Sequence, residues 1–167
     1  MRTRVLLCEA LAKEDCRSVP VFVATVNIYV TGLTMLILAS RYRSKKKKKR
    51  LALAKKCKGK MKMWARLSPS SHLHRLLHLQ AEWAAYNGKT KLSRERFVQA
   101  IDEAASSGSL WGEAVICERF SMILAAAGET SESKVMLRKA RDLFHQWGSI
   151  IKVGALTKQL NGGNLRD

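Results

Sequence analysis

Proline and cysteine are scarce in this chain, and each scarcity excludes something. The 167 residues include two prolines, Pro20 and Pro69, and both lie near changes in composition. Proline breaks helix interiors, so its scarcity suits a mostly helical protein. The four cysteines are scattered and form no Cys-x-x-Cys pair. This favours free thiols in a reducing compartment over a disulfide framework.

One segment of the chain has no charged side chains, and the segment that follows it has only positively charged ones. Residues 18–40 contain no charged side chain, and residues 41–66 hold fourteen Lys or Arg and no acid. The remainder, 67–167, holds thirteen basic and ten acidic side chains, so the formal net charge of +18 comes mostly from one segment. We therefore expect the following organisation: a short N-terminal segment (1–17), a candidate transmembrane helix (18–40), a polybasic linker (41–66), a helical domain (67–160) and a disordered tail (161–167).

The uncharged segment 18–40 is long enough to cross the ~30 Å hydrocarbon core of a bilayer as a helix. The basic residues that follow it predict that this flank faces the cytosol. We therefore expect a single-pass membrane protein with a cytosolic C-terminal domain. Three other interpretations stay open. The segment could be two buried β-strands rich in Val, Ile and Thr within a soluble protein, a cleaved secretory signal, or unfolded sequence that results from a wrongly chosen start codon.

The basic segment contains an unbroken run of six cationic side chains. Such a run is attracted to anionic lipids at a membrane surface. It is also typical of a nuclear localisation signal, a nucleic-acid-binding tail or a solvated, disordered linker. Only Tyr42 and Trp64 could supply base stacking, so nucleic acid is the less favoured partner. The candidate contacts for anionic lipid or nucleic acid are Lys45, Lys46, Lys47, Lys48, Lys49 and Arg50.

The second half of the chain reads as helices separated by glycine turns. Apolar residues at i, i+3 and i+4 spacing predict helices, which we place at 72–86, 91–105, 110–127, 131–147 and 150–160. Gly, Ala and Gly recur at a fixed spacing of 40 residues. The first set is Gly88, Ala100 and Gly108, and the second is Gly128, Ala140 and Gly148. Self-similarity of this kind indicates stacked helical hairpins. The expected fold is all-α, with two hairpins, a closing helix and an N-terminal transmembrane helix.

These residues resemble tetratricopeptide repeats. In that family a small residue ends the first helix and an Ala follows twelve residues later, as Gly88 with Ala100 and Gly128 with Ala140 do here. The period of 40 departs from the family's 34, and Ser93 and Ser133 stand where the family prefers Ala. The resemblance implies a concave face for a protein partner. Its first-helix positions would line or support that face, here Leu77, Ala81, Ala84, Cys117, Ser121 and Leu124, with Glu82 and Arg119 influencing partner choice.

A narrower resemblance covers residues 64–160. The runs AEWAAYNGK, QAIDEA, CERF and LRKARDLFHQWGSIIKVGAL are similar to the helical connector that follows the AAA-type ATPase domain in large multidomain signalling kinases. In that family the connector carries no chemistry of its own. The resemblance implies a role in signalling, with a kinase or ATPase module among the possible partners. The chain is then either a stand-alone relative or a fragment of such a kinase.

Catalytic and metal-binding motifs are incomplete. Gly88-Lys89-Thr90 contains the end of a phosphate-binding loop, but Trp83 stands where the loop needs its first Gly, and the preceding segment reads as helix. His74 and His78 share a helix face without a third metal ligand at a suitable spacing. No nucleophile, base and acid follow a known order. We therefore expect no enzymatic activity, no metal and no cofactor, and a non-catalytic scaffold for protein–protein interaction in signalling.

Overall fold

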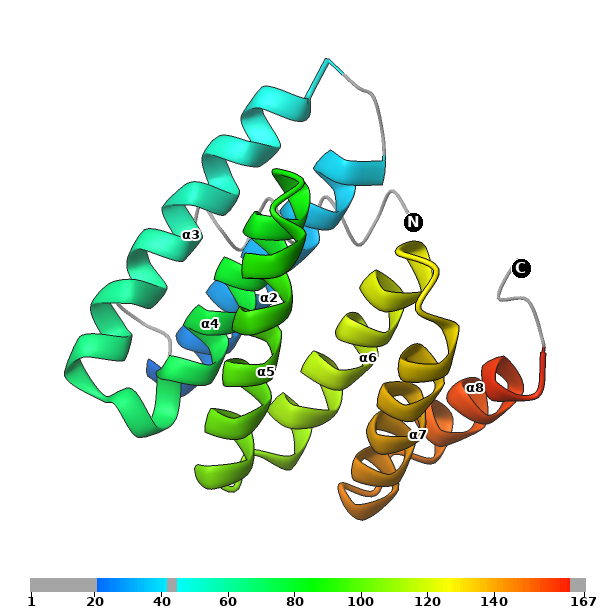
Figure 1. Cartoon of the computed structure of the whole chain (residues 1–167). Coiled ribbons are helices and arrows are strands. Elements are labelled where there is room, and N and C mark those ends of the chain that lie inside the picture. The colour runs from blue at the N-terminus through cyan, green and yellow to red at the C-terminus, as the bar shows by residue number, and fades with distance from the viewer. Residues whose placement is uncertain (1–20, 42–44, 163–167) are drawn as a thin grey trace. The chain divides into compact units, whose positions relative to one another are not determined.

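The structure is a computed structural model that describes residues 21–41 and 45–162 (Figure 1). This part of the chain contains seven helices and no strand. The helices are α2 (Val21–Arg41), α3 (Lys47–Leu67), α4 (Pro69–Tyr86), α5 (Thr90–Ser106), α6 (Leu110–Ala126), α7 (Thr130–Gln146) and α8 (Ile150–Leu160). The expected N-terminal segment 1–17 and most of the expected tail 161–167 lie outside the described residues.

The all-α class predicted from the sequence is confirmed for the described residues. Helices α5 to α8 begin and end within one residue of the predicted ranges, and α4 begins three residues earlier, at Pro69. Proline is favourable in the first turn of a helix, because the N–H that it lacks would have no partner there. The resemblance to tetratricopeptide repeats remains a hypothesis about how these helices pair.

The segment expected to be a polybasic linker forms a helix instead. Helix α3 takes up most of it, and its buried side chains Ala54, Cys57, Met61 and Ala65 recur at helical spacing. This narrow stripe packs against α2 and α4. Lysine is a good helix former, so the many charges do not oppose the helix while they face solvent. Residues 47–67 of the expected linker are therefore folded.

The chain divides into two compact units, residues 1–93 and 94–167, with the division inside α5. The sequence predicted the start of the helical domain at residue 67. The difference arises because α4 packs against α3 and α2, so the first predicted repeat helix belongs with the N-terminal elements. In the second unit, α7 packs against both α6 and α8.

Four turns of the same geometry separate the helices from α4 to α8. Gly88, Gly108, Gly128 and Gly148 lie 20 residues apart and adopt φ values between +67° and +87°. These values are favourable for glycine alone. In each turn the residue after the glycine donates its backbone N–H to a carbonyl five residues back, over 2.9 Å. This is the Schellman motif, which satisfies the last carbonyls of a helix.

The 40-residue recurrence is also present in buried hydrogen bonds. The Ser93 hydroxyl donates to the Ala81 carbonyl over 3.0 Å, and the Ser133 hydroxyl donates to the Ser121 carbonyl over 2.8 Å. Donor and acceptor are twelve residues apart in both cases. The two serines that depart from the tetratricopeptide pattern therefore make equivalent contacts between consecutive helices.

Helix α2 belongs to the core of the first unit. Its Tyr29, Met35 and Thr25 side chains are 1% exposed or less. Gly32 lies so close to α3 and α4 that a Cβ built on it would be 3.0 Å from Cys57 Cβ and 3.3 Å from a Leu79 methyl carbon. The absence of a side chain at Gly32 lets three helices approach one another closely.

Polar contacts also join α2 to α4. The Tyr29 hydroxyl and His78 Nδ1 are hydrogen-bonded over 2.6 Å, and Arg75 Nη1 donates to Thr25 Oγ1 over 3.3 Å. All four side chains are buried. Buried polar groups are costly when they lack a partner, so these contacts favour one register of α2 against α4.

Within the described residues, one helix is long and apolar enough to cross a membrane. It is Val23–Arg41, with a mean hydropathy of 1.7, and 61% of it is buried inside the protein. Helix α3 packs against this helix (Figure 1), and α3 carries ten Lys and Arg residues. The same residues therefore satisfy the length requirement of a span and serve as a core helix.

Candidate interaction surfaces

The side chains predicted to contact a protein partner are nearly all buried. Seven of the eight are 7% exposed or less. The seven are Leu77, Ala81, Glu82, Ala84, Cys117, Ser121 and Leu124. Arg119, the eighth, is half-buried. These side chains therefore mainly pack against neighbouring helices. A buried side chain can support a surface that a partner contacts, but it cannot line that surface.

The buried members of this set stabilise their own units. The carbonyls of Ala81 and Ser121 accept the repeated serine hydrogen bonds. Glu82 Oε1 lies 3.6 Å from His78 Nε2. Burial raises the pKa of the Cys117 thiol to about 12, which keeps it protonated and unreactive at neutral pH.

Carboxylates of the second unit are paired with basic side chains of the same unit. Glu113 lies 2.8 Å from Lys139 Nζ, and Glu118 lies 2.6 Å from Lys152 Nζ. Arg94 pairs with both Glu129 and Glu132. Because opposite charges meet within the unit, this part of the chain offers a partner little net charge.

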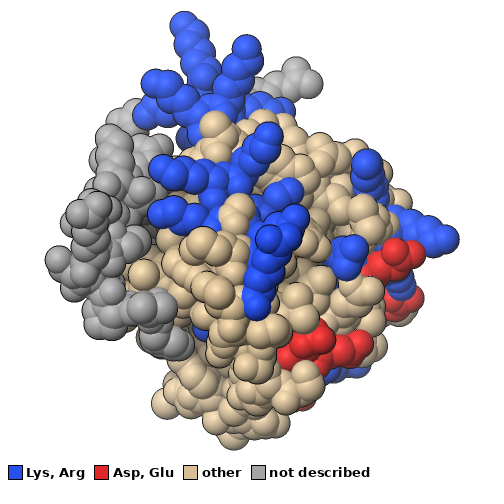
Figure 2. Space-filling model, turned by 90° about the vertical axis from the view of Figure 1, so that its left-hand side faces the viewer, with Lys and Arg blue, Asp and Glu red and all other residues tan. Residues whose placement is uncertain are grey.

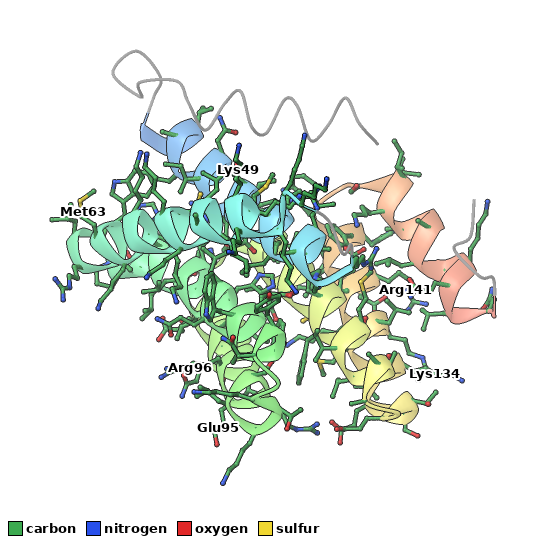
Figure 3. All side chains as sticks on the ribbon, turned by 90° about the horizontal axis from the view of Figure 1, so that it is seen from above. Lys49, Met63, Glu95, Arg96, Lys134 and Arg141 are labelled. Atoms are coloured by element: carbon green, nitrogen blue, oxygen red, sulfur yellow. The ribbon has the colours of Figure 1, made fainter. Side chains whose placement is uncertain are left out.

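The first unit carries a strong excess of positive charge on α3 (Figure 2). Of the run predicted from the sequence, Lys45, Lys46, Lys48 and Lys49 are exposed, and Lys47 and Arg50 are half-buried. Figure 3 shows Lys49 and Met63 projecting from well-separated points on α3. The run is therefore the first part of a longer basic surface that continues along α3.

Aromatic side chains of α4 hold two of the α3 lysines. Lys58 Nζ lies 4.4 Å from the centre of the Trp83 ring, and Lys47 Nζ lies 5.4 Å from that of Tyr86. Cation–π contacts of this kind contribute ~0.5–1 kcal/mol at exposed sites. Burial lowers the pKa of Lys58, with Lys55 and Lys62 adding repulsion. These contacts help to fix α3 in place.

An exposed apolar edge was not foreseen from the sequence. Trp147 is 52% exposed, and Ile150 and Ile151 at the start of α8 are 85% and 88% exposed. Leu110 and Trp111 lie 40 residues before Ile150 and Ile151 in the sequence. Leu110 is 37% exposed, and Trp111 is half-buried. The signal was the pair of isoleucines directly after a glycine turn. We call Trp147, Ile150 and Ile151 the α8 edge.

The histidines predicted not to form a metal site lie in the core of the first unit. His74 is 2% exposed, and neither of its ring nitrogens makes a hydrogen bond within the described structure. Burial lowers its pKa to about 4, with repulsion from Arg75, His72 and His78 adding to the effect. Among the described residues, no group of three or more His, Cys, Asp or Glu side chains is placed to hold a metal ion. The turn at Gly88-Lys89-Thr90 follows helix α4, as expected.

Comparisons with protein-family models, curated proteins and solved structures find no match to this chain.

Proposed function

We propose that this protein is a non-catalytic helical scaffold that binds another protein through the α8 edge. The observation that carries the proposal is the exposure of Trp147, Ile150 and Ile151, three large apolar side chains close in sequence, since exposed apolar surface marks interaction sites. The buried positions predicted from the sequence support the packing of the helices.

The repeated geometry supports a scaffold that a partner helix could extend. Helices α5 to α8 begin at 20-residue intervals, and their turns share one hydrogen-bond pattern. Helical repeats bury their apolar faces against neighbouring helices. The α8 edge is apolar and exposed. It fits a helix with complementary apolar side chains, and the kinase-connector resemblance makes a kinase or ATPase module one class of partner to test.

Photo-crosslinking tests this proposal. A photoreactive residue at position 151 of the full chain should give a discrete crosslinked protein in cells, whereas the same residue at exposed position 134 in α7 should not. The double variant Ile150→Ser, Ile151→Ser should weaken capture of that partner at least ~tenfold. Truncation of a side chain that anchors an interface costs ~2 kcal/mol or more of binding free energy. The melting temperature of this double variant should equal that of the original chain, since both side chains are exposed.

The matched control is the double variant Val98→Ser, Val135→Ser, which removes two exposed apolar side chains elsewhere. It should retain the partner. Equal loss in both double variants, or equal crosslinking at positions 134 and 151, would contradict a site at the α8 edge. A crosslinked homodimer would identify a second copy of the chain as the partner.

A second candidate role is a membrane tether, which the apolar length of Val23–Arg41 favours. In this role α2 is a single span and the rest of the chain is cytosolic. A spanning α2 is incompatible with the packing seen in the first unit, because α3, which packs against α2, would bring its basic residues into the bilayer. Each Lys or Arg at the centre of a membrane costs ~2.5–3.5 kcal/mol on insertion scales. A spanning α2 would have to leave α3 and α4.

We therefore expect alkaline carbonate extraction of membranes to release the full chain into the supernatant. Carbonate strips proteins held by charge and leaves integral spans in the pellet. A known single-pass protein in the same preparation is the control for retention. Retention of this chain in the pellet would support the tether and would mean that α2 separates from α3 and α4 in the cell.

A further inference from the structure

The outer side of α3 is a row of basic side chains without acidic partners. Seven Lys and Arg residues of this helix are exposed, and none forms an ion pair within the described structure. They are Lys48, Lys49, Lys55, Lys56, Lys60, Lys62 and Arg66. We call these seven residues the α3 basic face.

The described residues of the first unit have almost no negative charge to neutralise this face. Residues 21–93 contain seventeen Lys and Arg and a single acid, Glu82. Glu82 is 5% exposed and lies beside His78 in the core. Within the described residues, no carboxylate is therefore placed to neutralise the α3 basic face. The paired carboxylates of the second unit show that this imbalance is local.

The basic face is held on a rigid element. Helix α3 has 21 residues, which corresponds to about 30 Å of length. Buried Ala54, Cys57, Met61 and Ala65 fix its inner side, and the cation–π contacts of Lys47 and Lys58 tie it to α4. A row of positive charges of this length matches the phosphates of a nucleic acid, since a duplex carries one negative charge per ~1.7 Å of its axis.

An anionic membrane is the less suitable partner. A helix that lies in a membrane interface needs a wide apolar face to enter the acyl region. The apolar stripe of α3 is covered by α2 and α4. The large apolar side chains that α3 leaves exposed are Met63 and Leu67, near its C-terminal end. This helix can offer a flat lipid surface its charge but little apolar contact.

We propose that the α3 basic face binds the phosphate backbone of a nucleic acid duplex without sequence specificity. Six of its seven residues are lysines, which act as point charges and lack the planar fork by which Arg reads guanine. This surface is distinct from the α8 edge, so the proposal does not depend on the scaffold function.

Fluorescence anisotropy with a labelled 20-base-pair DNA duplex of random sequence tests this inference on the full chain. The logarithm of the affinity should fall with the logarithm of KCl concentration, with a slope of about −4 to −6 for five to seven phosphate contacts. The quadruple variant Lys55→Gln, Lys56→Gln, Lys60→Gln, Lys62→Gln should bind about a hundredfold more weakly near 0.1 M KCl. Its slope should be smaller in magnitude by about 3.5.

The control variant removes the same charge elsewhere, with Gln at exposed Lys89, Lys91, Lys134 and Arg138. It should lose less than about fivefold in affinity, and circular dichroism should show unchanged helix content in both variants. Equal loss in the two variants would overturn the inference, because binding would then follow net charge alone. Binding to vesicles of phosphatidylcholine with phosphatidylserine, without binding to the duplex, would also overturn it and would assign the face to lipid.

Discussion

Gly32→Val is expected to destabilise the first unit by about 3 kcal/mol. A Cβ at this position would lie 3.0 Å from Cys57 Cβ, which belongs to the rigid part of α3, and 3.3 Å from a Leu79 methyl carbon. Valine adds two methyl groups beyond this Cβ, and overpacking of a tight core costs ~1–3 kcal/mol or more. Hydrogen–deuterium exchange should show faster exchange of the backbone amides of α2, α3 and α4, with α6 and α7 unchanged.

The matched control is Gly59→Val, at the other helical glycine of the first unit. No heavy atom lies within 4 Å of a Cβ built there. The same substitution should change stability by less than about 0.5 kcal/mol, because Val and Gly differ only modestly in helix propensity. Similar effects of the two substitutions would mean that α2 does not pack against α3 and α4. In a membrane-spanning α2 the new side chain would meet lipid, and Gly32→Val would be harmless.

Sequence patterns were most informative where local chemistry decides structure. Glycine turns and apolar spacing located α4 to α8 to within a few residues, since a left-handed turn requires Gly and an amphipathic helix requires its apolar face. The four glycines Gly88, Gly108, Gly128 and Gly148 also recur every 20 residues, which is half of the 40-residue period recognised from the sequence. The shorter period reflects helices of uniform length.

Patterns were less informative where packing decides structure. The stripe on α3 consists of small or flexible side chains, Ala54, Cys57, Met61 and Ala65, and the surrounding lysines obscure it. The uncharged segment 18–40 meets the length requirement of a membrane span whether lipid or protein surrounds it. Residues that a repeat family presents to a partner are buried here, because burial depends on which helices cover that face. The α8 edge could be identified only from the fold. The same holds for the lack of ion pairs along the α3 basic face within the described residues.

Acid should destabilise the first unit through His74. This side chain is 2% exposed, and burial lowers its pKa from 6.5 to about 4. Between these two pH values the unfolded chain binds a proton at His74 and the folded chain does not. Stability therefore falls as the pH decreases through this window. A shift of this size corresponds to about 3 kcal/mol lost between pH 7 and pH 4.

The variant His74→Phe isolates this contribution. Phenylalanine is similar in shape and cannot bind a proton, and it removes two ring nitrogens that make no hydrogen bond in the described structure. At pH 7.5 the variant should be at least as stable as the original chain, because an unsatisfied buried polar group costs ~1–3 kcal/mol. Urea unfolding followed by exchange of α4 amides, at several pH values from 7.5 to 4, should show a flatter pH dependence in the variant.

The neighbours of His74 determine how the two profiles are compared. Arg75 stays charged throughout this range, and His72, His78 and Glu82 are present in both proteins. Their titration contributes to both profiles, and the difference between the profiles reports His74 together with its repulsion from His72 and His78. That difference should open below pH 6.5 and reach about 3 kcal/mol near pH 4. Parallel profiles would mean that His74 reaches water in the folded protein, which contradicts its burial in the first unit.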